Sequence, residues 1–331
     1  MYKPWMRALT LTLVTALIAL AAGTAQAETS PQACQNVNRY RVVELPFIPK
    51  VIARSGVVAG ITELHRAVVW RPKSGVAELP VPEGFHYTEP VAITPAGDVV
   101  VNAFDAEGHR RSAFLYSDQA VIGLSGNQTW AHGSGAASTV VGEWVPDGKA
   151  STDAVYWSNA VPHAIGLCCG GTLKAVNEAG DMIGDAYDDQ GRYHAFAWSP
   201  AHGQRIIDPT DAYSSAIAIN HAGHILLQVG RAAYLDDTNR LRRLDLAQKS
   251  YNSVQAMNDC DVVVGGYGTD SEHYLAFSWT AAAGFRDLNS LVPSHSGWKL
   301  QLATAINNRG EIVGSGELDR EDRGFLLIPQ H

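Results

Sequence analysis

Short apolar runs alternate with polar turns along almost the whole chain, and the same order of runs returns about every 43 residues. The clearest marker is a small residue followed by alternating apolar or aromatic positions, as in the stretch AFAW that begins at Ala195. An alternation with period two is typical of a β-strand, so each copy predicts one strand. The seven copies begin at Ala67, Ala113, Ala154, Ala195, Ala232, Ala276 and Gly324.

Other strand-like runs precede and follow each copy. The preceding motif is clearest in AINNRGEIVG at 305–314. It predicts two short strands joined by a tight turn, because Asn and Gly tolerate the left-handed backbone that turns need. The following run is shorter, as in GFRDLNSL at 284–291. Each repeat therefore predicts a four-stranded antiparallel meander, and the copy at 134–144 fits this pattern least well.

The last repeat lacks its fourth strand, but an extra strand-like run, RYRVVELPFI at 39–48, stands before the first repeat. Pairing of this run with GFLLIP at 324–329 would close a ring and cover both sheet edges. Repeats of 40–45 residues are typical of propeller blades. We therefore predict an all-β, seven-bladed β-propeller closed by its N-terminal strand. A β-solenoid, or six or eight blades, are the alternatives. The recurring aromatic residues are expected to pack between blades: Trp70, Tyr116, Trp157, Trp198 and Trp279.

The stretches AINNRGEIVGSG, YHAFAW and FRDLNSL resemble the HAF repeat of exported bacterial proteins. His194, Ala195 and Phe196 form the literal His-Ala-Phe copy, and the other six repeats depart from it, most often at the histidine. The resemblance covers roughly residues 39–329. It implies a repeat architecture and an extracytoplasmic location. It implies no catalytic residue set, and the recurring motif residues are expected to be structural.

The first 27 residues have the features of a cleaved signal peptide. Lys3 and Arg7 precede an apolar run, and AQA at 25–27 is a small-residue cleavage signature. A transmembrane anchor is the alternative, but the apolar run is short for one. We expect a signal peptide over 1–27, an N-terminal lead over 28–38, a single repeat domain over 39–331, and a secreted or periplasmic mature chain.

Composition argues against a polyanionic partner. Without the first 27 residues the chain has 23 Lys and Arg against 33 Asp and Glu, a formal charge of −10, and it has no basic cluster. Binding to nucleic acid needs Lys and Arg to neutralise phosphates, so we expect no nucleic-acid partner. No later stretch is long and apolar enough to predict a stable membrane span. A glycan, a peptide or a protein ligand all stay open.

All four cysteines follow the signal segment, and an exported chain can keep disulfides. Cys34 precedes the closing strand and Cys260 lies in a predicted turn on the same side of the ring, so we predict a Cys34–Cys260 disulfide. Cys168 and Cys169 are adjacent and can bridge only as a strained vicinal disulfide, or stay reduced. Mass spectrometry after non-reducing digestion is expected to recover the Cys34–Cys260 cross-link. Alkylation of both thiols without reduction would contradict it.

The loops between the second and third strands are predicted to lie on one face of the ring, and they are rich in acidic residues. Asp185, Asp188 and Asp189 are the best oxygen donors within one loop, and they predict a site for a sugar or for calcium, the only cofactor indicated. Their order does not match a calcium-loop pattern, and charged hairpin loops are usually solvated turns. No metal-ligating or nucleophile motif is present. We predict a non-enzymatic binding or scaffold protein. The alternative is a glycan-cleaving enzyme with paired carboxylates at the mouth of the propeller.

Overall fold

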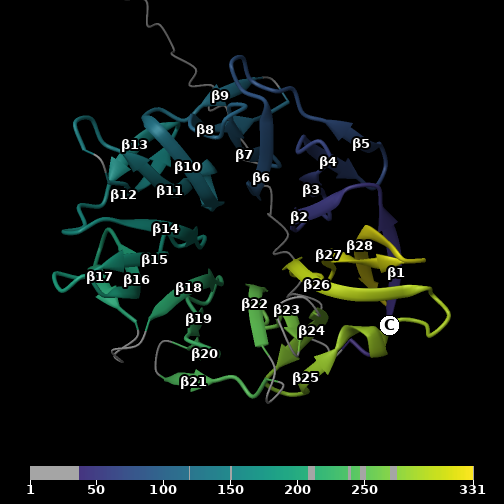
Figure 1. Cartoon of the computed structure of the whole chain (residues 1–331). Coiled ribbons are helices and arrows are strands. Elements are labelled where there is room, and N and C mark those ends of the chain that lie inside the picture. Colours follow the sequence, from purple (N-terminus) through teal and green to yellow (C-terminus); the bar gives the residue numbers. More distant parts are fainter. Residues whose placement is uncertain are drawn as a thin grey trace, which may run out of the picture. The chain divides into compact units, whose positions relative to one another are not determined.

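The computed structural model describes residues 37–118, 120–149, 151–207, 213–237, 240–246, 251–268 and 274–330. They belong to one compact unit, residues 34–331. The predictions of a signal peptide and of most of the N-terminal lead lie outside the described residues. Within this unit the chain forms seven four-stranded antiparallel sheets arranged around an axis (Figure 1).

In blades 1 to 6 the strands run outward from the axis in chain order, and in blade 7 the first three do so. The inner strands are β2 (Ile48–Ile52), β6 (Tyr87–Ile93), β10 (Asn127–Ser134), β14 (Gly171–Val176), β18 (Ser214–Ile219), β22 (Tyr251–Met257) and β26 (Trp298–Ile306). The second strands are β3 (Val58–Ile61), β7 (Val99–Phe104), β11 (Val140–Val145), β15 (Met182–Tyr187), β19 (Ile225–Val229), β23 (Val263–Gly268) and β27 (Ile312–Leu318). Blades 1 to 7 are numbered in this order.

The predicted small–aromatic motifs form the third strands, and shorter runs form the outer ones. The third strands are β4 (Ala67–Arg71), β8 (Arg111–Tyr116), β12 (Asp153–Ser158), β16 (Tyr193–Ser199), β20 (Ala232–Asp236), β24 (Tyr274–Thr280) and β28 (Glu321–Pro329). The outer strands of blades 1 to 6 are β5 (Gly75–Glu78), β9 (Val121–Gly123), β13 (Val161–Ala164), β17 (Gly203–Ile206), β21 (Leu241–Arg243) and β25 (Gly284–Asp287). Two short 3₁₀ helices complete the described elements, η1 (Ala136–Ser138) and η2 (Leu288–Leu291).

The ring is closed by the N-terminal strand, as predicted. β1 (Tyr40–Leu45) is the outer strand of blade 7, and it pairs antiparallel with β28 so that Leu45 lies opposite Gly324. The inner strands of neighbouring blades contact one another around the whole ring, including β26 with β2. The prediction of a seven-bladed propeller is therefore confirmed, and the β-solenoid and the six- or eight-bladed alternatives are wrong.

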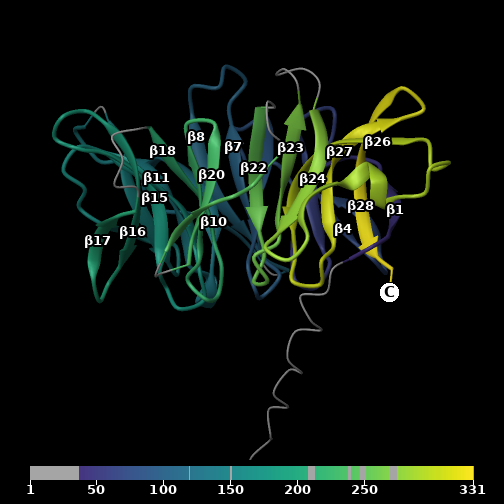
Figure 2. The same ribbon diagram turned by 90° about the horizontal axis from the view of Figure 1, so that it is seen from below.

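Antiparallel order gives the ring two different faces (Figure 2). We call the face with the loops between second and third strands, and with the connections between blades, the connection face. We call the face with the turns between first and second strands the turn face. The acid-rich loops lie on the connection face.

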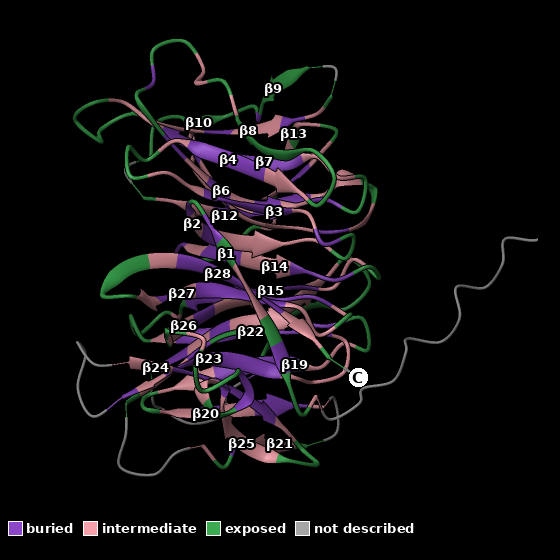
Figure 3. Ribbon diagram, turned by 90° about the vertical axis from the view of Figure 1, so that its right-hand side faces the viewer, coloured by how far each residue is buried: buried purple, intermediate pink, exposed green. Residues whose placement is uncertain are grey.

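The apolar core lies between blades, because each sheet buries both of its faces against its neighbours (Figure 3). Trp157 is fully buried between blades 2 and 3, and its Nε1 donates to the Ser125 carbonyl at 2.9 Å. Tyr116 is buried between blades 1 and 2, and its hydroxyl donates to the Pro80 carbonyl at 2.7 Å. The predicted packing of the recurring aromatic residues between blades is confirmed for these two.

One alignment of the repeat needs a correction. In blade 5 the copy begins at Ala233 rather than Ala232, because Ala233 pairs with Gln228 as Ala195 pairs with Asp185 in blade 4. Ala233 is buried, as the corresponding residues of the other blades are. Because Ala232 and Ala233 are adjacent, the sequence alone does not distinguish the two alignments. The shift places Asp236 at the aromatic position, where Arg205 of blade 4 donates to it at 3.2 Å.

The weak copy at 134–144 is a complete blade with an altered turn. Its first and second strands, β10 and β11, pair in the usual way, but η1 occupies the turn between them. Ala137 and Ser138 adopt left-handed φ values of 51° and 55° there. The turn sequence AAST at 136–139 contains neither the Asn nor the Gly of the clearest repeat, NNRG at 307–310.

Candidate functional site

The turn face carries a chain of hydrogen bonds that links five blades. In blades 4 to 7 the asparagine that ends the first strand accepts from backbone N–H groups of its own turn, and its Nδ2 donates to the next blade. The donated bonds run from Asn177 to the Asn220 carbonyl (3.3 Å), from Asn220 to Asp261 (2.8 Å), from Asn258 to the Asn307 carbonyl (3.1 Å) and from Asn307 to the Ala53 carbonyl (3.1 Å). These four asparagines are nearly or fully buried connectors between blades.

An ionic cluster crosses the channel at this same face. Arg54, in the turn between β2 and β3 of blade 1, contacts Glu178 of blade 4 at 2.6 Å and Asp259 of blade 6 at 2.9 Å. His221 of blade 5 lies 3.1 Å from Glu178 through its Nδ1. Blades 1 and 4 are three places apart in the ring, so the Arg54 side chain spans the end of the channel.

Asp185, predicted as an oxygen donor in a loop, is fully buried in β15 and points into the neighbouring blade. It forms an ion pair with Lys174, and its carboxylate accepts from the Ser215 hydroxyl at 2.9 Å and from the Ala216 N–H at 2.8 Å. Asn102 occupies the corresponding register in blade 2, where it accepts from Ala131 N–H at 2.9 Å. Asp185 therefore connects neighbouring blades as Asn102 does, but through a carboxylate instead of an amide.

Asp188 stays in the loop between β15 and β16 and stabilises that turn. It accepts from the N–H groups of Gln190 and Arg192, and the Arg192 side chain donates to it at 2.8 Å. These bonds lower the pKa of Asp188 to about 2. His194 lies 3.4 Å from the same carboxylate.

Asp189 is the exposed neighbour of Asp188 in this loop, whereas Asp185 is bonded to groups of blades 4 and 5. Across the described residues, no group of three or more His, Cys, Asp or Glu side chains is arranged to hold a metal ion. Calcium binding at these positions stays a prediction.

The cysteines lie where the repeat placed them, as far as the structure describes them. Cys168 and Cys169 occupy the connection between blades 3 and 4 as exposed, reduced thiols with their sulfur atoms 2.7 Å apart. The hydrogen bond to Cys168, together with nearby acidic side chains, raises the pKa of Cys169. Cys260 lies between β22 and β23 on the turn face. Cys34 is outside the described residues, so the Cys34–Cys260 disulfide stays a prediction.

The exposed tyrosines gather on the connection face. Tyr87, Tyr187, Tyr213 and Tyr251 stand at or next to strand ends on this side of the ring, and each is more than 40% exposed. Tyr193 joins two of these rings into a cluster of three at blades 4 and 5, because it packs edge-on against Tyr187 and stacks on Tyr213 at 5.0 Å. Burial and the nearby charge of Asp185 raise the pKa of Tyr193, so its phenol stays protonated.

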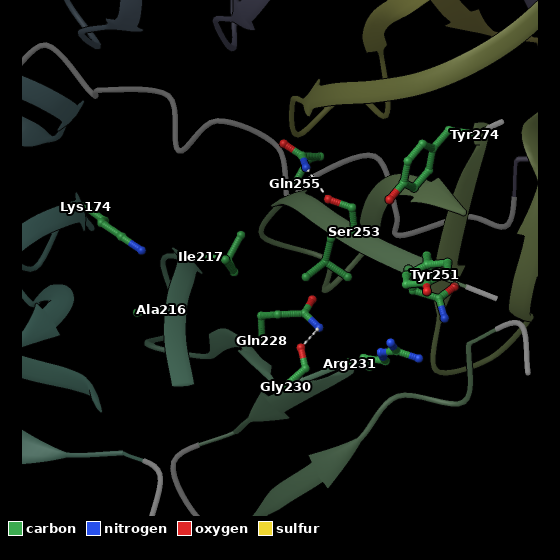
Figure 4. A pocket seen from close by; sticks show the side chains of 12 residues that line it. Lys174, Ala216, Ile217, Gln228, Gly230, Arg231, Tyr251, Ser253, Gln255 and Tyr274 are labelled. Atoms are coloured by element: carbon green, nitrogen blue, oxygen red, sulfur yellow. Dashed lines mark hydrogen bonds between the residues drawn. The ribbon is translucent and has the colours of Figure 1, made fainter. Parts of the chain in front are cut away.

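A pocket of about 480 Å³ opens beside this cluster, between the inner strands of blades 4, 5 and 6 (Figure 4). Lys174 reaches in from β14 on one side, and Arg231, Tyr251 and Tyr274 lie together on the other. The Gly230 N–H donates to the Tyr213 carbonyl at 3.1 Å, so pocket and cluster share a backbone contact. The rest of the lining is Ala216, Ile217, Gln228, Gly230, Asn252, Ser253, Val254 and Gln255.

The described lining contains two cations and no carboxylate. Lys174 is neutralised by Asp185 and also donates to the Ser215 hydroxyl at 2.6 Å. Arg231 lies over the Tyr251 ring, with its guanidinium carbon 4.8 Å from the ring centre. On the adjoining wall, burial and then the charges of Lys174 and Arg111 lower the pKa of His132 to about 4, so this histidine is neutral at pH 7. Among the described lining residues, Arg231 is therefore the cation that no described carboxylate balances.

Asp188 and Asp189 belong to a loop of the connection face, but none of the three predicted aspartates is among the described residues that line the pocket. Tyr213, Arg231 and Tyr251 come from three different connections, and none carries a motif. The available signal was the recurrence of tyrosine where inner strands begin, at Tyr87 and Tyr251.

No family model matches the chain, and no curated protein matches it in sequence. Solved structures match in fold. The propeller domain of the trilobed protease from Pyrococcus furiosus has a TM-score of 0.57 and 9% identity, over 88% of this chain and 96% of that one. Virginiamycin B lyase from Staphylococcus aureus has a TM-score of 0.53 and 8% identity, over 88% of this chain and 100% of that one. YCF48 bound to D1 peptide has a TM-score of 0.53 and 10% identity, over 89% and 97%. At these identities the likeness shows the propeller fold alone.

Within the described part of the chain, no helix is long and apolar enough to cross a membrane.

Proposed function

We propose that this chain is a secreted or periplasmic binding protein that holds a glycan on its connection face, at the channel mouth between blades 4 and 6. The observation that carries the proposal is the pocket of about 480 Å³ beside the tyrosine cluster. Small-ligand sites have volumes of about 300–1,000 Å³ and combine aromatic surface with a few convergent polar groups. Tyrosine provides a flat apolar ring and a polar hydroxyl, which suits the faces and the hydroxyl groups of a sugar.

Binding is favoured over cleavage by the described lining. Cleavage of a glycosidic bond ordinarily uses two carboxyl groups about 5–10 Å apart. The described lining supplies no Asp or Glu, and Asp185 behind it is already bonded to Lys174, Ser215 and Ala216. A peptide is the second candidate ligand, because a similar propeller, YCF48, was solved with a peptide bound.

The proposal is tested by a thermal-shift screen of the chain from residue 28 onward against soluble oligosaccharides, with divalent cations as separate additions. A ligand that binds only the folded state raises the melting temperature with its concentration. We expect the melting temperature to rise with at least one oligosaccharide. We expect Tyr251→Ala to weaken the binding of that oligosaccharide about 10-fold, because the sugar loses its stacking contact with the phenol ring.

Tyr87→Ala is the matched control. Tyr87 begins β6 as Tyr251 begins β22, on the same face, and the two side chains are 42% and 41% exposed. It is expected to leave binding unchanged. A flat screen, or equal loss of binding in both variants, would count against the site. Release of new reducing ends during the same incubations would favour the glycan-cleaving alternative.

A further inference from the structure

We infer that the pocket takes a short acidic glycan, and that Arg231 binds the carboxylate of one of its sugars. The inference rests on the proposed function and names the ligand class of the same site. It starts from the charges of the described lining, in which Lys174 is paired with Asp185, Arg231 is paired with no described carboxylate, and no Asp or Glu is present.

Arg231 is the cation that is available to a ligand. Lys174 already has its counter-charge in Asp185, whereas Arg231 is exposed and has no ion pair with any described carboxylate. The Tyr251 ring supports the guanidinium from one side. A guanidinium stacked on a ring keeps the N–H groups at its edge for a bidentate pair with a carboxylate, and the stack reduces the freedom lost on binding.

The remainder of the lining fits a polyhydroxylated ligand better than a peptide. Gln228, Ser253 and Gln255 contribute amide and hydroxyl groups, and the apolar lining residues are small or medium-sized aliphatic ones. The Gln228 amide donates to the Gly230 and Ala232 carbonyls and the Gln255 amide donates to the Ser253 hydroxyl, so a ligand would meet the oxygen atoms of these groups as acceptors. The lining therefore has many hydrogen-bonding groups and no deep apolar socket among the described residues. Two tyrosines, Tyr251 and Tyr274, add flat surfaces.

The surrounding face limits how acidic the ligand can be. The loops and strand ends of the connection face carry acidic side chains such as Asp188, Asp189 and Glu317. Like charges disfavour a long polyanion there, while a single carboxylate that reaches Arg231 gains a local attraction. A short glycan with one or a few uronic or sialic acid residues satisfies both conditions.

The experiment measures affinity by isothermal titration calorimetry for acidic oligosaccharides and their neutral counterparts. The probes are trigalacturonate with galactotriose, and sialyllactose with lactose. We expect an acidic member to bind more tightly than its neutral counterpart. We expect Arg231→Gln to weaken that acidic member about 10-fold or more and to leave the neutral one unchanged, because a charge-assisted bidentate contact is lost. The affinity of the Arg231→Lys variant for the acidic oligosaccharide is expected to lie between those of the unaltered chain and of Arg231→Gln. Lysine keeps the positive charge but cannot form the bidentate contact of a guanidinium.

Arg320→Gln is the control, because Arg320 is an exposed arginine on the same face in the loop between β27 and β28. Equal binding of acidic and neutral members, with no effect of Arg231→Gln, would overturn this inference and leave the proposed function standing. Absence of binding for all oligosaccharides would overturn both. Binding of a peptide through its C-terminal carboxylate, with no glycan bound, would overturn the glycan class while keeping the role of Arg231.

Discussion

A chain that begins at residue 47 is expected to lose the closed ring, whereas a chain that begins at residue 37 keeps it. The two differ only by the segment that contains β1, which pairs along its whole length with β28 and buries Tyr40 and Leu45 to 3% and 1% exposure. Loss of a large buried side chain costs about 2–5 kcal/mol, so the deletion costs about 5 kcal/mol or more of a total stability of about 5–15 kcal/mol.

The expected result is a melting temperature at least about 10 °C lower by circular dichroism, with oligomers in sedimentation velocity. Oligomers form because the uncovered edge of β28 can pair with another chain. Both chains lack Cys34, so the predicted disulfide does not enter the comparison. A synthetic peptide of residues 39–46 is expected to restore part of the melting temperature. Equal melting of the two chains would show that β1 does not hold the ring closed.

Replacement of Asp185 is expected to have the next largest effect. Asp185→Ala leaves the Lys174 ammonium without its counter-charge and the Ser215 and Ala216 groups without their acceptor. Breaking a buried ion pair by removing one partner costs about 3–5 kcal/mol. The free energy of unfolding, measured by urea denaturation, is expected to fall by that amount.

Asn102→Ala is the matched control, because Asn102 makes the equivalent connection in blade 2 without a charge. It is expected to cost about 1–3 kcal/mol, the usual penalty for unsatisfied buried backbone groups. Asp185→Asn is expected to cost less stability than Asp185→Ala, since the amide oxygen of asparagine can still accept from the Ala216 N–H. If Asp185→Ala cost no more than Asn102→Ala, the ion pair with Lys174 would contribute nothing to stability.

The blade architecture was predictable from sequence because its causes are local and repeat seven times. Period-two alternation, turn residues and the run at 39–48 that lacks a partner within its own repeat are all visible along the chain. The asparagine of the AIN motif was correctly placed in a turn, but its role was different. Gly180 and Gly310 adopt left-handed backbone there, with φ of 87° and 74°, and the asparagines do not. Their amides connect blades, a contact that only the ring creates.

The site was less predictable, since its members come from separate blades. Asp185 was grouped with Asp188 and Asp189 because the three are close along the chain, yet the period of β15 turns Asp185 into the interface between blades. An alignment of VVVNAF at 99–104 with MIGDAY at 182–187 contains a hint, because Asn102 and Asp185 share a position. The pairing of Arg231 with Tyr251 had no such signal.

The ion pairs of Arg54 across the turn face limit how a polymer can engage this ring. A strand of polysaccharide cannot be threaded from one face to the other while those contacts hold. Whatever enters from the connection face must leave by the same route. If the proposed glycan belongs to a polymer, we therefore expect that polymer to stay on the connection face, with a terminus, a short branch or a segment laid across the channel mouth at the pocket.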